Sequence, residues 1–121
     1  MASTKLCRDY ILEQLNMLNN VTYRPMMGEY LLYYNNVLFG GIYDNRLLIK
    51  KVDNNKKYNL TEVIPYDGSK TMYLINDIEN KKLLSDIVID TYEALKKTIW
   101  KIVFFSPLKK VLEALVKIDK L

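Results

Sequence analysis

The stretch from residue 22 to residue 50 constrains the fold most, because it has the pattern of short strands joined by tight turns. It is rich in tyrosine, leucine and β-branched residues, which are typical of β-structure. Asn35-Asn36 and Asp44-Asn45 suit the central positions of two-residue hairpin turns, where both residues need positive φ. We therefore predict an antiparallel meander of three strands, over residues 30–34, 37–43 and 46–51.

Shorter segments on either side extend this sheet. Residues 21–24 are predicted as a short strand that ends or bulges at Pro25, which cannot donate a ladder hydrogen bond. Residues 62–66 and 71–75 flank Asp67-Gly68, a strong hairpin signal. The polar, Asn/Lys-rich segment 52–61 between them is predicted to be a surface loop. The predicted sheet has about five strands.

The middle strand of the meander contains an unusual pair, Gly40-Gly41. Glycine weakens a strand unless a bulge forms or another group packs closely on the backbone. We expect a helix or a neighbouring chain at this point, rather than a phosphate group.

Helical patterns lie before and after the strands. An N-terminal helix is predicted to begin after Ser3 or Thr4 as N-cap and to end near Leu18, with Cys7 on its apolar stripe. A second, longer helix is predicted from Asp86, with Ser85 as its N-cap. Its apolar face contains Leu84, Val88, Leu95, Ile99 and Ile102. The predicted fold is therefore α+β, with an N-terminal helix and C-terminal helices packed on an antiparallel sheet.

Composition limits the classes of function. A chain of 121 residues fits one domain. The single cysteine excludes an internal disulfide and a Cys-rich zinc site, and it suits a reducing, cytoplasmic setting. The first residues carry charges and lack the long apolar core of a signal peptide, and no segment is long and apolar enough to be transmembrane. Histidine is absent, which removes the commonest general base and metal ligand. We predict a non-enzymatic protein without a metal or cofactor.

Three acids on the second helix, Asp86, Asp90 and Glu93, are spaced as neighbours on one face. They can be drawn as a metal site, but one helix face supplies no second set of ligands. Acidic residues in the N-terminal half of a helix also complement its dipole. We interpret these three as solvated acids.

The end of the chain is basic. Residues 96–121 contain seven lysines and two acids, a net charge of +5, which leaves −1 for residues 1–95. Ser106-Pro107 is predicted to begin a new helix, with Leu108, Val111, Leu112, Leu115 and Val116 on its apolar stripe. Its lysines face away from that stripe: Lys109, Lys110 and Lys117. We divide the chain into a domain of residues 1–102 and a basic amphipathic helical extension of residues 103–121.

This extension has three interpretations. It binds nucleic-acid phosphates, it binds an anionic membrane surface, or it buries its stripe while its lysines keep the chain soluble. The third is the commonest for so regular a stripe. Trp100, Phe104 and Phe105, with Lys101 among them, concentrate large apolar residues at the helix junction. Such a concentration indicates an interface, within the chain or with a second copy.

The order of residues in the central stretch resembles a known family. The matching positions are Val21, Thr22, Arg24, Met26, Gly28, Tyr30, Leu32, Tyr33, Phe39, Ile42, Asp44, Leu47, Lys50, Val52 and Asp53. Over about residues 3–100 the chain is similar to the N-terminal domain of the TfoX/Sxy family of bacterial competence regulators. It departs from that pattern at Pro25, Met27 and Glu29, where the family often has Arg, Phe and Gly. The resemblance implies a two-layer α+β fold similar to type III secretion chaperones.

The resemblance also implies a function. Full-length TfoX proteins have a second, helical domain and are linked to activation of DNA-uptake genes with the cyclic-AMP receptor protein. This chain looks like a stand-alone N-terminal domain, so we expect a regulatory or adaptor protein. Its partner is then a protein, either transcription machinery or a second copy in a homodimer. The candidate interaction residues are Arg24, Met26, Gly28, Tyr30, Tyr33, Phe39, Asp44 and Lys50.

Two other functions remain open from the sequence. The first is direct nucleic-acid binding through the lysine-rich C-terminal helices. The second is a small-ligand or enzymatic pocket near Arg24, Met26 and Tyr30. The missing histidine makes an enzyme the weakest of these hypotheses.

Overall fold

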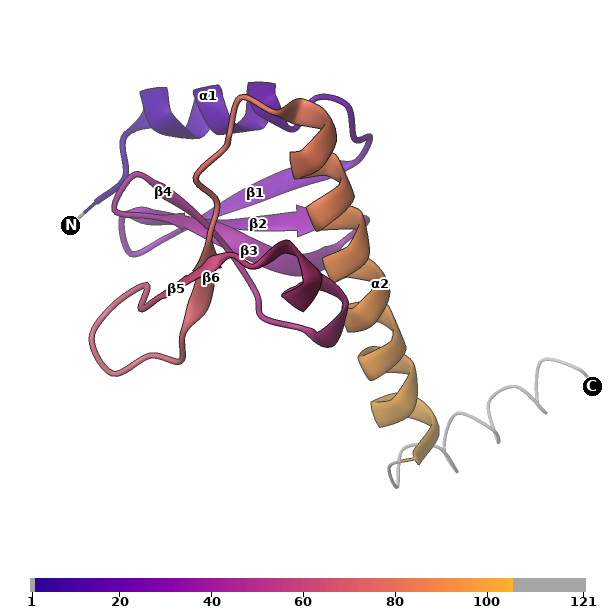
Figure 1. The fold of residues 1–121 in the computed structure, drawn as a ribbon. Helices are drawn as coiled ribbons and strands as arrows, with labels where there is room; N and C mark the ends of the chain where they lie inside the picture. Colours follow the sequence, from indigo (N-terminus) through magenta and orange to yellow (C-terminus); the bar gives the residue numbers. More distant parts are fainter. Residues whose placement is uncertain (1, 106–121) are drawn as a thin grey trace, which may run out of the picture.

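The computed structural model describes residues 2–105, with side chains for residues 2–99 (Figure 1). One sheet of six strands has the order β1-β2-β3-β4-β6-β5, and each strand pairs with its neighbours in antiparallel fashion. The predicted α+β fold is confirmed. The elements in chain order are α1 (Lys5–Gln14), β1 (Val21–Met26), β2 (Glu29–Tyr34), β3 (Val37–Tyr43), β4 (Arg46–Ile49), the 3-10 helix η1 (Asp53–Tyr58), β5 (Thr61–Val63), β6 (Met72–Leu74) and α2 (Lys81–Phe105).

Tight turns with left-handed residues join the first four strands. Asn35 and Asn36 have φ values of 49° and 66°, and Asp44 and Asn45 have 52° and 58°, as their residue types predict. A third turn of this kind, at Met27 and Gly28, joins β1 to β2, where the sequence predicts only a bend. β1 also continues through Pro25 to Met26, so the predicted break at Pro25 is wrong. β1 is an edge strand, and an edge strand tolerates proline because its outer side makes no hydrogen bonds to a neighbouring strand.

The glycine pair in β3 is crowded by neighbouring strands. The β2–β3 register shifts between Leu32 and Tyr33, which marks a bulge or irregularity next to the pair. A Cβ atom on Gly40 would lie 2.2 Å from the carbonyl oxygen of Leu48 in β4. On Gly41 it would lie 2.7 Å from the carbonyl oxygen of Tyr30 and from the Tyr43 ring. The expected helix is therefore wrong, because these strands themselves approach too closely for any side chain, and the alternative of a neighbouring chain stays a prediction.

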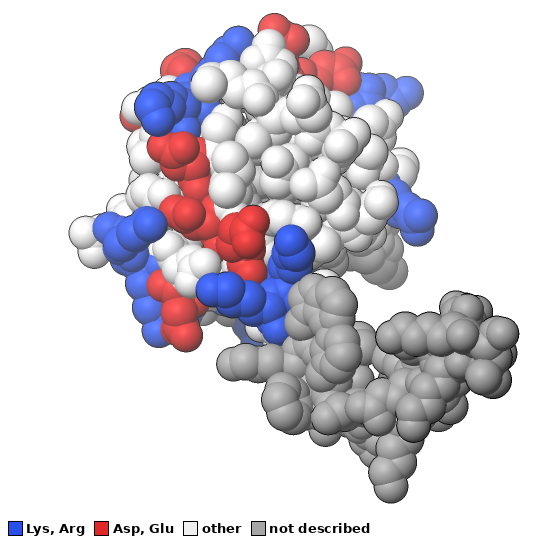
Figure 2. Space-filling view, turned by 90° about the vertical axis from the view of Figure 1, so that its right-hand side faces the viewer, with Lys and Arg blue, Asp and Glu red and all other residues white. Residues whose placement is uncertain are grey.

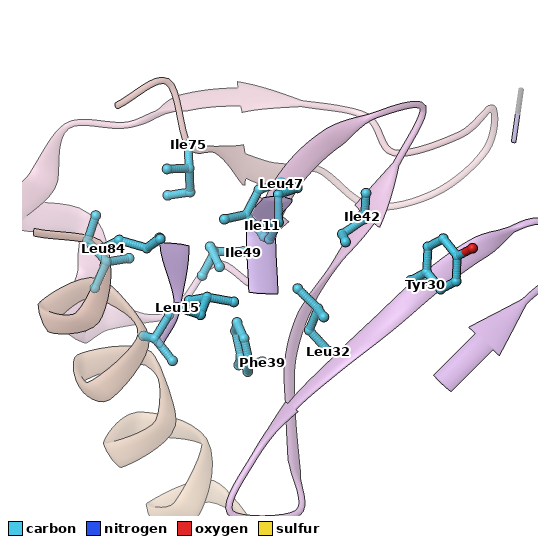
Figure 3. Packing of buried hydrophobic residues seen from close by; sticks show 12 residues of the cluster. Ile11, Leu15, Tyr30, Leu32, Phe39, Ile42, Leu47, Ile49, Ile75 and Leu84 are labelled. Carbon is cyan, nitrogen blue, oxygen red and sulfur yellow. The ribbon is translucent and has the colours of Figure 1, made fainter. Parts of the chain in front are cut away.

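Both helices pack on the same face of the sheet, where they form one core (Figure 3). Ile11 and Leu15 of α1 and Leu84, Ile87 and Val88 of α2 are essentially inaccessible to solvent. They pack with five strand residues that are fully buried: Leu32, Phe39, Ile42, Leu47 and Ile49. We call this side of the sheet the helix face. About ten large side chains lost to solvent make it the main source of stability.

The helix ends differ from their predicted positions. Thr4 is the N-cap of α1, since its Oγ1 accepts a hydrogen bond from the backbone N–H of Cys7 at 3.1 Å. The helix ends at Gln14, earlier than predicted, and Asn20 then takes a left-handed conformation with φ 64°. α2 begins at Lys81 rather than Asp86, because Asn80 Oδ1 accepts from the N–H of Leu83 at 3.1 Å.

Residue Ser85, predicted as the N-cap of α2, instead lies buried inside that helix. Cys7 is half-buried, and this burial raises the pKa of its thiol. A raised pKa disfavours the reactive thiolate, in keeping with a packing role.

Candidate interaction surfaces

Half of the candidate interaction residues build the fold rather than a surface. Phe39 is fully buried in the core, and Tyr30 is only 8% exposed beneath α1. Gly28 and Asp44 occupy left-handed turn positions. The structure therefore uses four of the eight candidate interaction residues for packing or turns. The other four lie on β1, β2 and the end of β4: Arg24, Met26, Tyr33 and Lys50.

Glu29, one of the departures from the family pattern, has a structural task. Its Oε1 accepts a hydrogen bond from Ser3 Oγ at 2.9 Å, and its Oε2 accepts from the backbone N–H of Asp44 at 2.7 Å. Ser3 Oγ in turn accepts from the N–H of Asn45 at 3.0 Å. The Glu29 carboxylate thus ties the N-terminal segment to the β3–β4 turn. No sequence pattern indicated this contact, because it joins residues far apart in the chain.

The segment predicted as a surface loop contains a buried polar residue. Asn55 in η1 is fully buried, and its Nδ2 donates to the Lys50 carbonyl at 2.8 Å and to Thr91 Oγ1 at 2.9 Å. Its Oδ1 accepts from the N–H of Val52 at 3.1 Å. The loop prediction is wrong here, because Asn55 is buried and donates hydrogen bonds to polar groups at the end of β4 and on α2. This cluster of Asn55 and Thr91 fixes η1 against α2.

Two of the acids of α2, Asp86 and Asp90, contact nearby lysines, and Asp90 also contacts a tyrosine. Tyr58 OH donates a hydrogen bond to the Asp90 carboxylate, and Lys57 Nζ lies 3.0 Å from the same group. Burial and this hydrogen bond raise the pKa of Tyr58 to about 12. Burial alone would raise the pKa of Asp90, but the hydrogen bonds from Tyr58 and Lys57 outweigh it and lower that pKa.

We call the charged side chains of η1 and α2 around Asp90 the charged band. Figure 2 shows charged residues gathered on the α2 side, beside a broad uncharged area. Asp86 pairs with Lys82, one turn away on α2, at 3.5 Å. Within residues 2–105, no three acidic, Cys or His side chains are grouped to hold a metal ion.

The side of the sheet opposite the helices is only partly covered, and we call it the outer face. Side chains alternate between the two faces of each strand, and the outer face is defined by Leu31, Tyr33, Leu38, Leu48 and Met72. Leu48 is fully buried although it is not part of the core beneath the helices. The other four are half-buried. The β5–β6 loop, residues 64–71, contributes a buried proline, Pro65.

A cleft of about 730 Å³ lies between this loop and the outer face. Its lining combines apolar, aromatic and basic residues; the principal ones are Leu38, Tyr43, Pro65, Tyr66, Met72, Lys50 and Lys70, together with Leu95 of α2. We call it the outer cleft. Its volume lies within the range of roughly 300–1,000 Å³ found for sites that hold small ligands or side chains of a partner.

The charges at the outer cleft are basic. Lys51 Nζ lies 2.6 Å from Glu62 Oε1 and donates to Thr71 Oγ1 at 3.0 Å, so its charge is compensated. Within the part of the chain that the structure describes, Lys50 and Lys70 take part in no ion pair. The cleft therefore presents two uncompensated positive charges above an apolar floor.

The structure does not join Arg24, Met26 and Tyr30 in one pocket. Arg24 lies on the exposed edge strand β1, with its guanidinium 5.8 Å from the centre of the Tyr33 ring. Tyr30 instead belongs to the helix face, where the Arg8 guanidinium lies 5.4 Å from its ring centre. Arg24 does line a hollow of about 530 Å³ with Thr22, Tyr23, Tyr33 and Asn36.

A second surface is the far end of α2, which extends past the sheet (Figure 1). Leu95 packs against the core, and the side chains described after it, residues 96–99, are all exposed. Ile99 is 48% exposed. Trp100, Lys101, Phe104 and Phe105 follow on the α2 backbone, but their side chains lie outside the description. So does the predicted helix with Lys109, Lys110 and Lys117.

Among the residues that the structure describes, no helix has the length and apolar character needed to cross a membrane.

No protein-family model matches the chain, and no curated protein sequence matches it. The TfoX/Sxy resemblance thus remains a prediction from the residues of the central stretch.

Proposed function

We propose that this chain is a non-enzymatic regulatory or adaptor module that acts by binding another protein. The observation that carries this proposal is the outer face, where the half-buried Leu38 and Met72 line an open cleft that also includes Leu95 of α2. Apolar surface that is left open on a folded domain marks interaction sites. The absence of histidine from the sequence supports a role without catalysis.

The resemblance to TfoX/Sxy N-terminal domains gives this proposal a biological setting. It places the module in the bacterial cytoplasm, among regulators of DNA uptake, with transcription machinery as the partner. Four candidate interaction residues are not used for packing or turns, and we propose that they contact the partner: Arg24, Met26, Tyr33 and Lys50.

Self-association belongs to the same proposal. α2 continues for ten residues after Leu95, which packs against the core, and the described side chains of this stretch, residues 96–99, are exposed, Ile99 among them. The sequence adds Trp100, Phe104 and Phe105 to this part of the helix. Two copies that pack these segments together would bury them. Sedimentation of the full chain and of residues 1–102 tests this clause: a dimer only for the full chain is expected, and a monomer in both contradicts it.

An affinity pull-down from native cells tests the adaptor function. The baits are the full chain, a chain without residues 103–121, and the outer-face variant Leu38→Glu. Met17→Glu is the matched control, since Met17 is 57% exposed and lies after α1. We expect a partner that Leu38→Glu loses and Met17→Glu keeps, with both variants folded by circular dichroism. A partner held equally by all baits, or none, contradicts the proposal.

Nucleic-acid binding is the second candidate, and the net charge of +5 on residues 96–121 favours it. Binding through lysines releases counterions, so affinity for a DNA duplex would fall steeply as salt rises. The test compares the wild type with a chain carrying Lys109→Gln, Lys110→Gln and Lys117→Gln. Loss of low-salt binding in the variant supports this function, and absence of binding by the wild type at low salt rejects it.

A further inference from the structure

We propose that the outer cleft binds an acidic peptide segment of the partner, one that carries an apolar side chain between its carboxylates. This inference rests on the proposed adaptor function and names the chemistry of its ligand. Three features of the cleft lead to it: an apolar floor, a fixed wall and two uncompensated lysines.

The floor of the cleft is suited to an apolar side chain. Leu38 and Met72 are half-buried at its base, and Tyr43 is 7% exposed beside them. A buried Leu, Met or Phe from a partner would displace water from these groups. Methionine adapts its shape to different apolar ligands. The floor therefore selects for apolar character without demanding one particular side chain.

The wall of the cleft, formed by loop 64–71, is held in place by side chains. Arg46 Nε donates to the Tyr43 carbonyl at 3.1 Å, and its Nη2 donates to the Ile64 carbonyl at 3.5 Å. Ser69 Oγ donates to the Tyr66 carbonyl at 2.8 Å, which closes the loop on itself. The rings of Tyr43 and Tyr66 lie 6.3 Å apart between centroids. A preformed wall reduces the ordering cost of binding.

The rim supplies the charge selectivity. Lys50 and Lys70 line the same cleft, and Glu62, which lies near it, is occupied by Lys51. Carboxylates of a bound segment would meet both uncompensated lysines, while a basic segment would meet like charges. Charge complementarity of this kind sets partner choice and association rate.

The same features favour a peptide over a nucleic acid. A nucleic-acid strand needs a row of cations along its phosphates and flat aromatic surfaces for its bases. The cleft has two uncompensated lysines and an aliphatic floor of Leu38 and Met72. The Tyr43 ring packs against Gly41, which leaves Tyr66, 60% exposed, as the ring available at the wall.

The test begins with random dodecapeptides displayed on phage and selected on the immobilised full chain. We expect enriched peptides to contain Asp or Glu on both sides of Leu, Met or Phe. The best peptide, synthesised with a fluorescent label, is then titrated by anisotropy. We expect the double variant Lys50→Glu with Lys70→Glu to bind this peptide at least about tenfold more weakly. A tenfold loss of affinity corresponds to about 1.4 kcal/mol.

The matched control is Lys5→Glu with Lys97→Glu, which changes the net charge equally at exposed lysines outside the cleft. It should bind within about twofold of the wild type. A drop equal to that of the cleft variant would show a general charge effect and overturn the inference. Circular dichroism of both variants confirms that they are folded.

The remaining outcomes also decide the matter. No enrichment, enriched peptides without acidic residues, or full binding by Lys50→Glu with Lys70→Glu would each overturn the inference. Tighter binding of a thymidine 20-mer than of any peptide, lost in the same variant, would assign the cleft to nucleic acid instead. If the pull-down partner still depends on Leu38, the adaptor function survives such a result. If neither peptide nor protein is retained, both proposals fail.

Discussion

The two faces of the sheet are built from the same strands and serve different purposes. On the helix face, Leu32, Leu47 and Ile49 are fully buried beneath α1 and α2. On the outer face, Leu31 and Leu38 are half-buried, and Leu38 lines an open cleft. Neighbouring residues such as Leu31 and Leu32 point to opposite faces. The difference teaches that identical side chains specify the fold on one face and remain available for contacts on the other.

The largest expected contrast between the faces comes from Leu47→Ala and Leu38→Ala. Leu47→Ala empties a fully buried position and should lower the free energy of unfolding by about 2–5 kcal/mol. Leu38→Ala should cost no more than about 1 kcal/mol, because part of that side chain already meets water. Urea unfolding of each variant measures both values. Equal losses would show that the outer face is a second core and not a surface.

Gly40→Ala tests the close approach of β3 and β4, the strands that carry both faces of the sheet. The new Cβ would meet the Leu48 carbonyl at 2.2 Å, so a strand must move, at a cost of about 3 kcal/mol. Gly68→Ala is the control, with φ of 83° and open space around it, and should cost about 1 kcal/mol through backbone strain alone. Thermal unfolding distinguishes the two. A neutral Gly40→Ala would refute the close strand approach described for β3 and β4.

Asn55→Ala tests the polar contact at the edge of the helix face. It leaves the Lys50 carbonyl and Thr91 Oγ1 without the amide that now donates to them, and should cost about 1–3 kcal/mol. Lys56→Ala, next to it on the surface, should stay within about 0.5 kcal/mol of the wild type. Urea unfolding measures both. A loss for Lys56→Ala as large as that for Asn55→Ala would argue against the buried cluster.

The smallest effect concerns the charged band of η1 and α2. The pKa of Asp90 is lowered in the fold, so its contribution is present above the ordinary carboxyl pKa of about 4 and is lost as pH falls through the lowered value. We expect Asp90→Asn to cost less than about 1 kcal/mol at pH 7, and nothing once Asp90 is protonated. Urea midpoints of both chains from pH 7 to pH 2 measure this. A constant difference across that range would contradict the assigned contacts.

Tyr58 gives the matching test at high pH. Its pKa is raised to about 12, so its contribution is complete below the ordinary value near 10 and is lost as pH rises through 12. Tyr58→Phe should therefore differ from the wild type at pH 9 and approach it above pH 12. Spectroscopic titration of the tyrosines provides the check. A Tyr58 that ionises near pH 10 would show that the Asp90 contact is absent.

Local sequence signals predicted much of the fold. Asn35-Asn36 and Asp44-Asn45 placed two hairpin turns correctly, because few residues accept positive φ. Thr4 was a correct N-cap candidate. Ser85 was wrong as an N-cap because Asn80, with an equally suitable side chain, comes first. Signals of this kind depend on a few adjacent residues, so the chain itself displays them.

The outer cleft could not be predicted, because it depends on contacts between distant segments. The run from Tyr30 to Tyr34 is apolar throughout, so its period does not reveal which side chains face the helices. Lys50 and Lys70 are 20 positions apart, and nothing local indicates that loop 64–71 folds over β3. Asn55 was hidden in a polar run for the same reason. The resemblance named Lys50, which lines the cleft, but it also named Phe39, which is buried in the core.

The most direct test of the central claim is to map where an acidic peptide touches the sheet. Amide chemical-shift changes of the isotopically labelled full chain would be followed while the phage-selected peptide is added. The account predicts changes centred on Leu38, Lys50, Met72 and loop 64–71, reaching Leu95 of α2, with α1 and the part of α2 before Leu95 unaffected. Changes centred on α1 or on Ile99, with loop 64–71 silent, would contradict it.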